Sequence, residues 1–371
     1  MARHYLDHAS TSPARPEVVE AMLPWLAAAA DPGRVHTEGM RARVAVEDAR
    51  RQVAALLGSR PREVVFTSGA TEAIAAAVFG ATERGSHLVC PAVEHSAVRE
   101  SSARVDVTTV GVDGLGRVDL DEVLTAVRPG QTALVHLQWA NHEVGTLQPA
   151  AEVATACRRL GVLNHCDAAA AAGHVPVGFG DSGADLMSVS AHKLGGPPGV
   201  GALLVRRGLR LRPLLLGGDQ ERARRAGTEN VAGIVGFGAA AGLLLERREA
   251  EAAVARTLTD RLLTAALSVD GVDAYGDVDR RLPHVVCFGV AGVEAEGVVL
   301  GLDQAGVAVH SGSACSSESL EPSPVLAAMG VDARHSVRIS VGWSSTEADV
   351  DAFTAAFPQV VGRLRALASG V

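Results

Sequence analysis

The chain alternates short runs of β-forming apolar residues with segments of helical character, and this alternation limits its fold more than any other feature. Apolar runs at residues 63–67, 87–91 and 132–139 each precede a helix-like segment. Strands that are each followed by a helix predict a largely parallel sheet with helices on both faces. Ligands collect at the carboxyl ends of the strands in such sheets, so we expect the functional residues at those ends.

The pattern changes after a long helical stretch at about residues 230–266, which we interpret as a connector. Beyond it, strand-like runs at residues 285–290 and 337–342 bracket the segment with Cys315 and an expected helix at residues 323–330, which predicts a smaller α+β domain that the N-terminal segment joins. The expected division is a large domain over residues 15–255 and a small domain made of residues 1–14 and 256–371.

Composition excludes several classes of protein. With 47% hydrophobic residues the chain can build a core, and its net charge of −8 argues against bulk attraction to nucleic acid. The most apolar stretch, residues 233–245, is shorter than the roughly 20 residues of a membrane span. The five cysteines form no CxxC pair, and the opening MARHYLDHAS lacks the apolar run of a signal peptide. We therefore expect a cytoplasmic protein without a membrane or direct nucleic-acid partner.

Three strand ends carry residues with a chemical use. TSGATE (67–72) places a glycine turn before a helix, whose free N–H groups can bind a phosphate, although Thr71 could instead cap an ordinary helix. Asp167 ends a buried strand, where its carboxylate either pairs with a protonated ring nitrogen or caps the alanine run that follows. Lys193, in a chain with very few lysines, is either a Schiff-base amine or a surface charge at a strand end.

These features are more informative together than separately. A phosphate site, a carboxylate for a ring nitrogen and a Schiff-base lysine follow one another along the chain, each at a strand end. Pyridoxal phosphate requires those three things of a protein. The sequence therefore predicts an enzyme that uses pyridoxal 5′-phosphate, and no metal site.

With these motifs in place, the chain resembles the cysteine desulfurases, within the class V aminotransferases of the fold-type I pyridoxal-phosphate enzymes. The resemblance covers essentially the whole chain and implies a large domain with a mainly parallel seven-stranded sheet and a smaller α+β domain. SGSAC with the SLEPS segment marks the subgroup with a long cysteine loop. The matching segments are YLDHASTSP (5–13), FTSGATE (66–72), VEHSAV (93–98), NHEVGTLQP (141–149), SAHK (190–193), RRAGT (224–228), SGSACSS (311–317), SLEPSPVLAAMG (319–330) and VRISVG (337–342).

The resemblance also implies roles for individual residues. Lys193 would carry the cofactor as a Schiff base, Asp167 would keep its pyridine nitrogen protonated, and His95 would stack on its ring and take a catalytic part in moving protons. Arg338 would grip the substrate carboxylate with its planar fork, which a lysine does less well. The remaining implied contacts are the phosphate ligands Ala70, Thr71, Ser190 and His192, the cofactor ligand His142, the substrate ligand Asn141, and Thr228, which would reach the phosphate of the other subunit of a homodimer.

The sequence departs from the family at three positions near the cofactor, and one of them, Ala191 in place of the usual Gly, is a small change. His142 stands where the family usually has Asn, and Ala170 where it usually has Gln, both on the cofactor's phenolic oxygen. His142 can still donate a hydrogen bond, whereas Ala170 cannot. Either His142 alone supports that oxygen, or a water molecule or a neighbouring side chain replaces the missing Gln.

Cys315 lies among small polar residues in HSGSACSSE (310–318), with no second cysteine near it in sequence. By itself this segment could hold an incidental exposed thiol. The resemblance implies that the Cys315 thiolate takes sulfur from L-cysteine, leaving alanine, and passes it as a persulfide to an acceptor protein such as an iron–sulfur scaffold or a thiolation enzyme. The other four cysteines are expected to be structural: Cys90, Cys157, Cys166 and Cys287.

Two other functions remain open. A related pyridoxal-phosphate enzyme, such as a selenocysteine or C–S lyase or an aminotransferase, would use the same cofactor site, but transamination needs no nucleophile like Cys315. A non-catalytic sulfur carrier would have no reason to retain both Lys193 and Cys315. The sequence does not identify the sulfur acceptor, and it does not decide between cysteine and selenocysteine.

Overall fold

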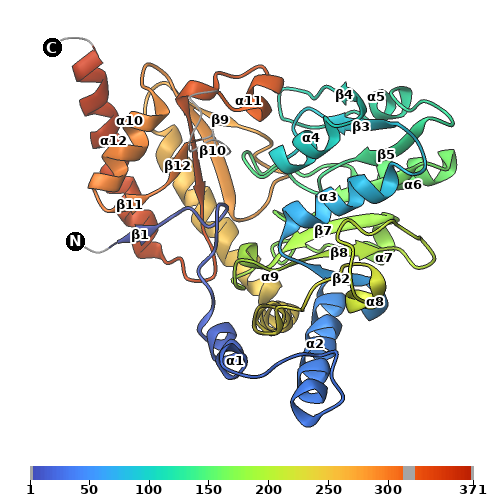
Figure 1. Ribbon diagram of the computed structural model, residues 1–371. Helices are drawn as coiled ribbons and strands as arrows, with labels where there is room; N and C mark the ends of the chain where they lie inside the picture. Colours follow the sequence, from blue (N-terminus) through green and yellow to red (C-terminus); the bar gives the residue numbers. More distant parts are fainter. Residues whose placement is uncertain (1–2, 312–321, 369–371) are drawn as a thin grey trace.

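A seven-stranded sheet forms the centre of the larger part of the molecule (Figure 1). The computed structural model describes residues 3–311 and 322–368. In the sheet β8 runs antiparallel to both of its neighbours, and the other strands run parallel to one another, which confirms the predicted mainly parallel sheet. The strand order is β2 (Val64–Thr67), β8 (Gly201–Val205), β7 (Leu186–Ser190), β6 (Leu163–Asp167), β5 (Thr132–His136), β3 (His87–Pro91) and β4 (Asp106–Val110).

Helices cover both faces of this sheet, as the alternation predicted. Successive strand residues point to opposite faces, so Leu134 packs with α3 (Ala70–Ala81) on one face while Val135 joins the core on the other. That second face is covered by α2 (Thr37–Leu56), α6 (Ala150–Leu160) and the first half of α9. The central strands are therefore buried on both faces, and every residue of β5, β6 and β7 is buried, the polar ones included.

Helix α9 (Val231–Leu267) runs from the large sheet into the smaller part of the molecule (Figure 1). Its buried residues up to Leu244 belong to the core of the large sheet, and those from Ala255 onward belong to a second core. The expected boundary between residues 255 and 256 falls inside this unbroken helix, and the boundary stays a prediction.

The second core lies between helices and a four-stranded antiparallel sheet. The N-terminal strand β1 (His4–Tyr5) pairs with β11 (Val307–Ala308), so the start of the chain lies beside this part of the molecule. The strand order is β12 (His310–Ser311), β13 (Ser336–Ser340), β10 (Val285–Val290) and β9 (Val272–Tyr275), and the helices are α10 (Ala295–Gln304), α12 (Glu347–Ala368) and the second half of α9.

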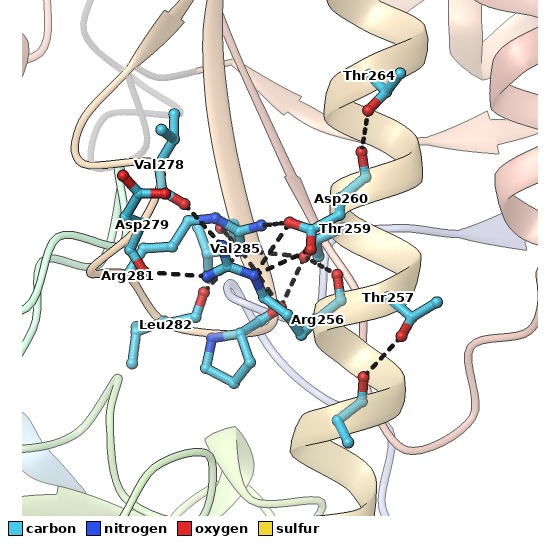
Figure 2. A network of polar contacts seen from close by, with 12 residues as sticks. Arg256, Thr257, Thr259, Asp260, Thr264, Val278, Asp279, Arg281, Leu282 and Val285 are labelled. Carbon is cyan, nitrogen blue, oxygen red and sulfur yellow. Dashed lines mark hydrogen bonds and ion pairs between the residues drawn. The ribbon is translucent and has the colours of Figure 1, made fainter.

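A buried arginine fastens the segment before β10 to α9 (Figure 2). The Nη1 group of Arg281 donates to the carbonyl oxygens of Leu282 (3.0 Å) and Val285 (3.1 Å) and to the hydroxyl of Thr259 (3.0 Å). Its Nη2 group donates to Asp260 at 2.6 Å. Burial, and then the neighbouring Arg256, lower the pKa of Arg281 to about 10. Because the main chain at residues 280–282 also pairs with residues 145–147, this segment ties α9 to the loop that follows β5.

The remaining elements are short. Residues 221–223, within the turn labelled α8 (Gln220–Ala223), have left-handed φ values of 49°, 59° and 59°, although none of the three is glycine. No helix in the described ranges is long and apolar enough to cross a membrane. The other helices and turns are α1 (Pro16–Leu26), η1 (Pro61–Glu63), α4 (Ser96–Ser102), α5 (Leu120–Thr125), α7 (Phe179–Ser182), η2 (Ala191–Lys193), α11 (Pro324–Ala328) and η3 (Ala333–His335).

Candidate active site

A cavity of about 480 Å³ opens at the carboxyl ends of the parallel strands. The strands β2, β3, β5, β6 and β7 all run in one direction, so the residues that follow them meet at one edge of the sheet. The N-terminal turn (residues 7–11) and β13 close the cavity from the side of the smaller sheet. The residues that line it are Ala9, Ser10, Ser68, Gly69, Ala70, Thr71, Glu72, Ile74, His95, Gln138, Ala140, His142, Asp167, Ala169, Ala170, Ser190, His192, Lys193, Pro198, Gly199 and Arg338.

Lys193 supplies the amine of the cavity. It is the only lysine of the 371 residues, and it ends the short 3-10 turn η2 that comes directly after β7. Its Nζ donates to the carbonyl oxygens of Ala9 and Ser10, the second at 3.0 Å. The N-terminal turn therefore holds the amine at the cavity wall. This position differs from that of a surface lysine at a strand end, which was the other interpretation of Lys193.

Asp167 supplies a carboxylate at the end of β6. Its Oδ1 accepts hydrogen bonds from the Ser188 hydroxyl and the Ala169 N–H, both at 3.0 Å. Asp167 thus caps the N–H of the residue two positions on, although a turn and not a helix follows it. It also lines the cavity, where it can meet a ring nitrogen.

A second carboxyl group, that of Glu94, lies behind this part of the cavity. Glu94 is fully buried and its Oε1 accepts a hydrogen bond from the Gln138 N–H at 2.6 Å. Burial, and then the negative charge of Asp167, raise the pKa of Glu94 to about 8. One of the two neighbouring carboxyl groups thus carries a proton at neutral pH.

The first turn of α3 forms the part of the cavity suited to an anion. Gly69 is the N-cap of α3, so Thr71 lies within the first turn and the capping alternative for Thr71 is wrong. The first N–H groups of a helix have no intrahelical acceptor and favour a phosphate. Strand β8 can pass beneath this turn because residue 201 is glycine: a Cβ there would lie 2.7 Å from the Cα of Gly69.

Three histidines border the cavity. The Nδ1 of His95 accepts a hydrogen bond from the Ala97 N–H at 3.0 Å, so the neutral ring carries its proton on Nε2. The rings of His95 and His142 meet edge to face with centroids 4.8 Å apart. Burial, and then the charge of Lys193, lower the pKa of His192 to about 4, so His192 is neutral at physiological pH.

Arg338 reaches the cavity from β13, although it is 2% exposed. Its Nη2 donates to Ser10 Oγ at 2.7 Å and to Asp7 Oδ1 at 3.0 Å, and its Nη1 donates to the carbonyl oxygen of His142 at 3.1 Å. Both parts of the molecule thus contribute to one site, and a planar cation faces the same cavity as the amine and the carboxylate.

Two of the predicted site residues that the structure describes, Asn141 and Thr228, do not line this cavity. Asn141 is fully buried, and its side chain binds the main chain at Val93, Glu143 and Val144, so it shapes the turn that carries His142. Thr228 is exposed outside the cavity, and its contact with a second subunit stays a prediction. Cys315 lies outside the described residues.

The four described cysteines are all buried: Cys90, Cys157, Cys166 and Cys287. Burial raises the pKa of each of these thiols, to about 12 for Cys157 and Cys287. None of them is easily ionised, which suits the structural role expected for them.

Sequence reasoning missed five polar residues around the cavity. Asp7, Ser10 and Ser188 orient predicted site residues, Gln138 lines the cavity, and Glu94 lies behind it. Gln138 donates its amide to the carbonyl oxygen of Val93, so that amide is already engaged. A polar residue just after a strand was the available signal for Gln138, and a serine inside an apolar strand was the signal for Ser188, but nothing local marks Asp7 or Ser10 as neighbours of Arg338.

Comparison with known proteins identifies the family. The family model described as aminotransferase class-V matches residues 4–353. The chain belongs to this family. It is 44% identical to a cysteine desulfurase of Trichormus azollae, over 98% of this chain and 94% of that protein. Among solved structures, a NifS-like protein aligns with a TM-score of 0.91 and 32% identity, over 98% of this chain and all of that one. A structure titled SspA in complex with cysteine aligns with a TM-score of 0.81 and 30% identity, over 92% of this chain and all of that one.

Class V aminotransferases use pyridoxal phosphate, and the residues of this cavity fit that cofactor. An amine, a carboxylate and a helix N-terminus match its aldehyde carbon, its ring nitrogen and its phosphate. The cavity volume is also within the range of roughly 300–1,000 Å³ that holds small molecules.

Proposed function

We propose that the chain is a pyridoxal-phosphate-dependent cysteine desulfurase that converts L-cysteine to L-alanine. The observation that carries this proposal is one cavity that combines the Lys193 amine, the Asp167 carboxylate, the first turn of α3 and the Arg338 guanidinium. The relatives named cysteine desulfurase and the solved relative titled as a cysteine complex support the choice of substrate.

The residues that would hold the cofactor come from three strand ends, those of β2, β6 and β7. The first turn of α3, with Thr71, Ser190 and His192, would bind the phosphate, and Asp167 would bind the ring nitrogen. Neutral His192 can donate a hydrogen bond to an anion without adding a charge beside Lys193. The bound cofactor would supply an electron sink for the pair released at the substrate Cα.

Two residues would then act on the substrate. Arg338 would bind the carboxylate of L-cysteine and fix the orientation of its Cα–H bond. Lys193 would accept the Cα proton on Nζ and return it later, because its amine already lies at the cavity wall. The ring of His95, whose orientation the Ala97 N–H fixes, would flank the reacting atoms.

Sulfur transfer would use Cys315. Its thiolate would attack the sulfur of L-cysteine, so that an S–S bond forms and the substrate's Cβ–S bond breaks. The electron pair of the broken bond stays on Cβ, which is protonated to give L-alanine, and Cys315 keeps the sulfur as a persulfide. The buried thiols Cys90, Cys157, Cys166 and Cys287 are unsuited to this step because burial raises their pKa.

The persulfide would pass to an acceptor protein, such as an iron–sulfur scaffold or a thiolation enzyme. We also propose a homodimer, in which the exposed Thr228 of one subunit would contact the phosphate of the other. Glu221 lies at the start of the segment that leads to Thr228, and its carboxylate forms two 2.7 Å hydrogen bonds with buried Arg50. This ion pair would fix the segment for such a contact.

A single-turnover experiment with L-cysteine tests the proposal. The wild type should give alanine and protein-bound persulfide in equal amounts, and Cys315→Ala should give neither. Cys157→Ala removes a thiol from α6, away from the cavity, and should behave like the wild type. Pyruvate as product, or alanine that survives in Cys315→Ala, would contradict the proposal. Because Lys193 is the only lysine, borohydride reduction should attach the cofactor to one lysine peptide.

A further inference from the structure

The N-terminal turn, residues 7–11, is a fixed wall of the cavity. The Tyr5 hydroxyl donates to the carbonyl oxygens of Asp7 (3.0 Å) and Thr11 (2.8 Å). The Ala9 N–H donates to the Ser340 hydroxyl on β13 at 2.8 Å. Lys193 binds the main chain of the same turn at Ala9 and Ser10. This turn therefore touches both the amine and, through its side chains, the guanidinium of the site.

The side chains of this turn occupy one nitrogen of Arg338. Nη2 carries two hydrogens and donates to Asp7 Oδ1 at 3.0 Å and to Ser10 Oγ at 2.7 Å. The Ser10 hydroxyl in turn donates to Asp7 Oδ1 at 2.9 Å. The Nε of Arg338 is buried and has no hydrogen-bond partner among the described residues.

This arrangement matters because of how a guanidinium binds a carboxylate with two hydrogen bonds. It uses either Nη1 with Nη2 or Nε with Nη2, so Nη2 takes part in both geometries. A carboxylate that binds Arg338 in either way must first replace Asp7 or Ser10 on Nη2. Asp7 makes a single contact, whereas an incoming carboxylate can make two, and a two-point contact is the stronger one.

We propose that Asp7, held in place by Ser10, is a specificity-determining residue that competes with the substrate carboxylate for Nη2 of Arg338. This inference rests on the proposed function. A ligand that offers a well-placed carboxylate displaces Asp7 and binds with two hydrogen bonds. A ligand that offers a single weak acceptor leaves the Asp7–Arg338 pair intact. The pair thus selects ligands whose carboxylate makes two contacts over anions that make one contact, and it does not affect simple amines.

The test uses Asp7→Asn in the holoenzyme, since Asn keeps the shape and removes the competing charge. Steady-state kinetics give KM for L-cysteine, and absorbance titrations give Kd for the product L-alanine and for cysteamine, which has the amine and thiol but no carboxylate. We expect KM and the Kd of L-alanine to fall by roughly tenfold, the factor that corresponds to about 1.4 kcal/mol. The Kd of cysteamine should not change.

Two further variants keep the test decisive. Ser10→Ala removes a neutral acceptor from Nη2 and should lower KM in the same direction but by a smaller factor, because neutral hydrogen bonds are weaker than charge-assisted ones. Asp303→Asn removes the exposed ion pair with Arg3, in the same N-terminal segment, and should leave KM unchanged.

Opposite results would overturn the inference. An unchanged or higher KM in Asp7→Asn means that Asp7 does not compete with the substrate, and an equal change for cysteamine means that the effect does not act through the carboxylate. If the wild type fails to convert L-cysteine, the proposed function fails and the inference fails with it. Normal wild-type turnover with an unchanged KM in Asp7→Asn overturns the inference alone.

Discussion

Glu94 should make the stability of the folded protein depend on pH. Its side chain is fully buried, Oε1 accepts the Gln138 N–H, and Oε2 has no hydrogen-bond partner among the described residues. Burial and then the charge of Asp167 raise the pKa of this carboxyl to about 8, from 4.5 in the unfolded chain. The folded protein therefore holds a proton that the unfolded chain releases over this pH range.

The sign and size of the effect follow from this difference in pKa. Between pH 4.5 and about 8 the folded state binds one more proton than the unfolded state, so the free energy of unfolding falls as the pH rises. The slope is at most about 1.4 kcal/mol per pH unit, which gives an upper limit of about 5 kcal/mol over the whole range. Local rearrangement that admits water to the carboxyl reduces this value.

Glu94→Gln removes the titrating proton and keeps an oxygen for the Gln138 N–H. Chemical denaturation of both proteins, in steps from about pH 5 to about pH 9, gives the free energy of unfolding at each pH. The variant should gain stability relative to the wild type as the pH rises. Glu94→Ala should show the same relative slope but lie lower at every pH, because the Gln138 N–H also loses its acceptor. A difference between Glu94→Gln and the wild type that does not vary with pH would refute the reasoning.

Three further changes test the framework around the site. Ala223→Gly should be neutral or stabilising by up to about 1 kcal/mol in thermal unfolding, because Ala223 has a left-handed φ of 59°. The control Ala250→Gly, on the exposed side of α9, should cost about 1 kcal/mol. A loss of stability at position 223 as large as that at position 250 would contradict backbone strain at Ala223. Glu221→Ala should cost about 4 kcal/mol, since it leaves buried Arg50 without its carboxylate, and a loss below about 1 kcal/mol would count against this. Arg281→Ala should cost roughly 3 kcal/mol by denaturant unfolding, because the buried carbonyl groups before β10 lose their donor (Figure 2); an unchanged midpoint would show that water replaces it.

The fold was predictable because its determinants are local. Apolar runs such as residues 132–136 are long enough for a strand and too short for a buried helix, and each precedes an amphipathic or alanine-rich segment. Boundaries were less predictable where helix propensity continues through a domain boundary, as in α9, whose residues carry no break between its two cores. The reversed direction of β8 has no local sequence signal either.

Part of the site could also be predicted from the sequence. Asp167 ends a strand and Thr71 and Lys193 lie in the turns that follow strands, and parallel strands bring their carboxyl ends to one edge. Family resemblance added Arg338, His95 and the phosphate ligands, which the cavity brings together, as well as Asn141, whose side chain supports a turn instead.

The sequence by itself therefore determined which elements form and which chemical groups stand at their ends, because strand period, glycine turns and the position of the single lysine are properties of neighbouring residues. Tertiary structure alone decided which of those groups meet. Asp7 and Arg338 are 331 positions apart, yet the pairing of β1 with β11 and of β12 with β13 brings them within 3.0 Å. The raised pKa of Glu94 likewise arises from burial beside Asp167, which only the packing of β3 against β5 and of β5 against β6 creates. Distances between segments remote in sequence depend on the order in which strands join the sheet, and no local pattern encodes that order.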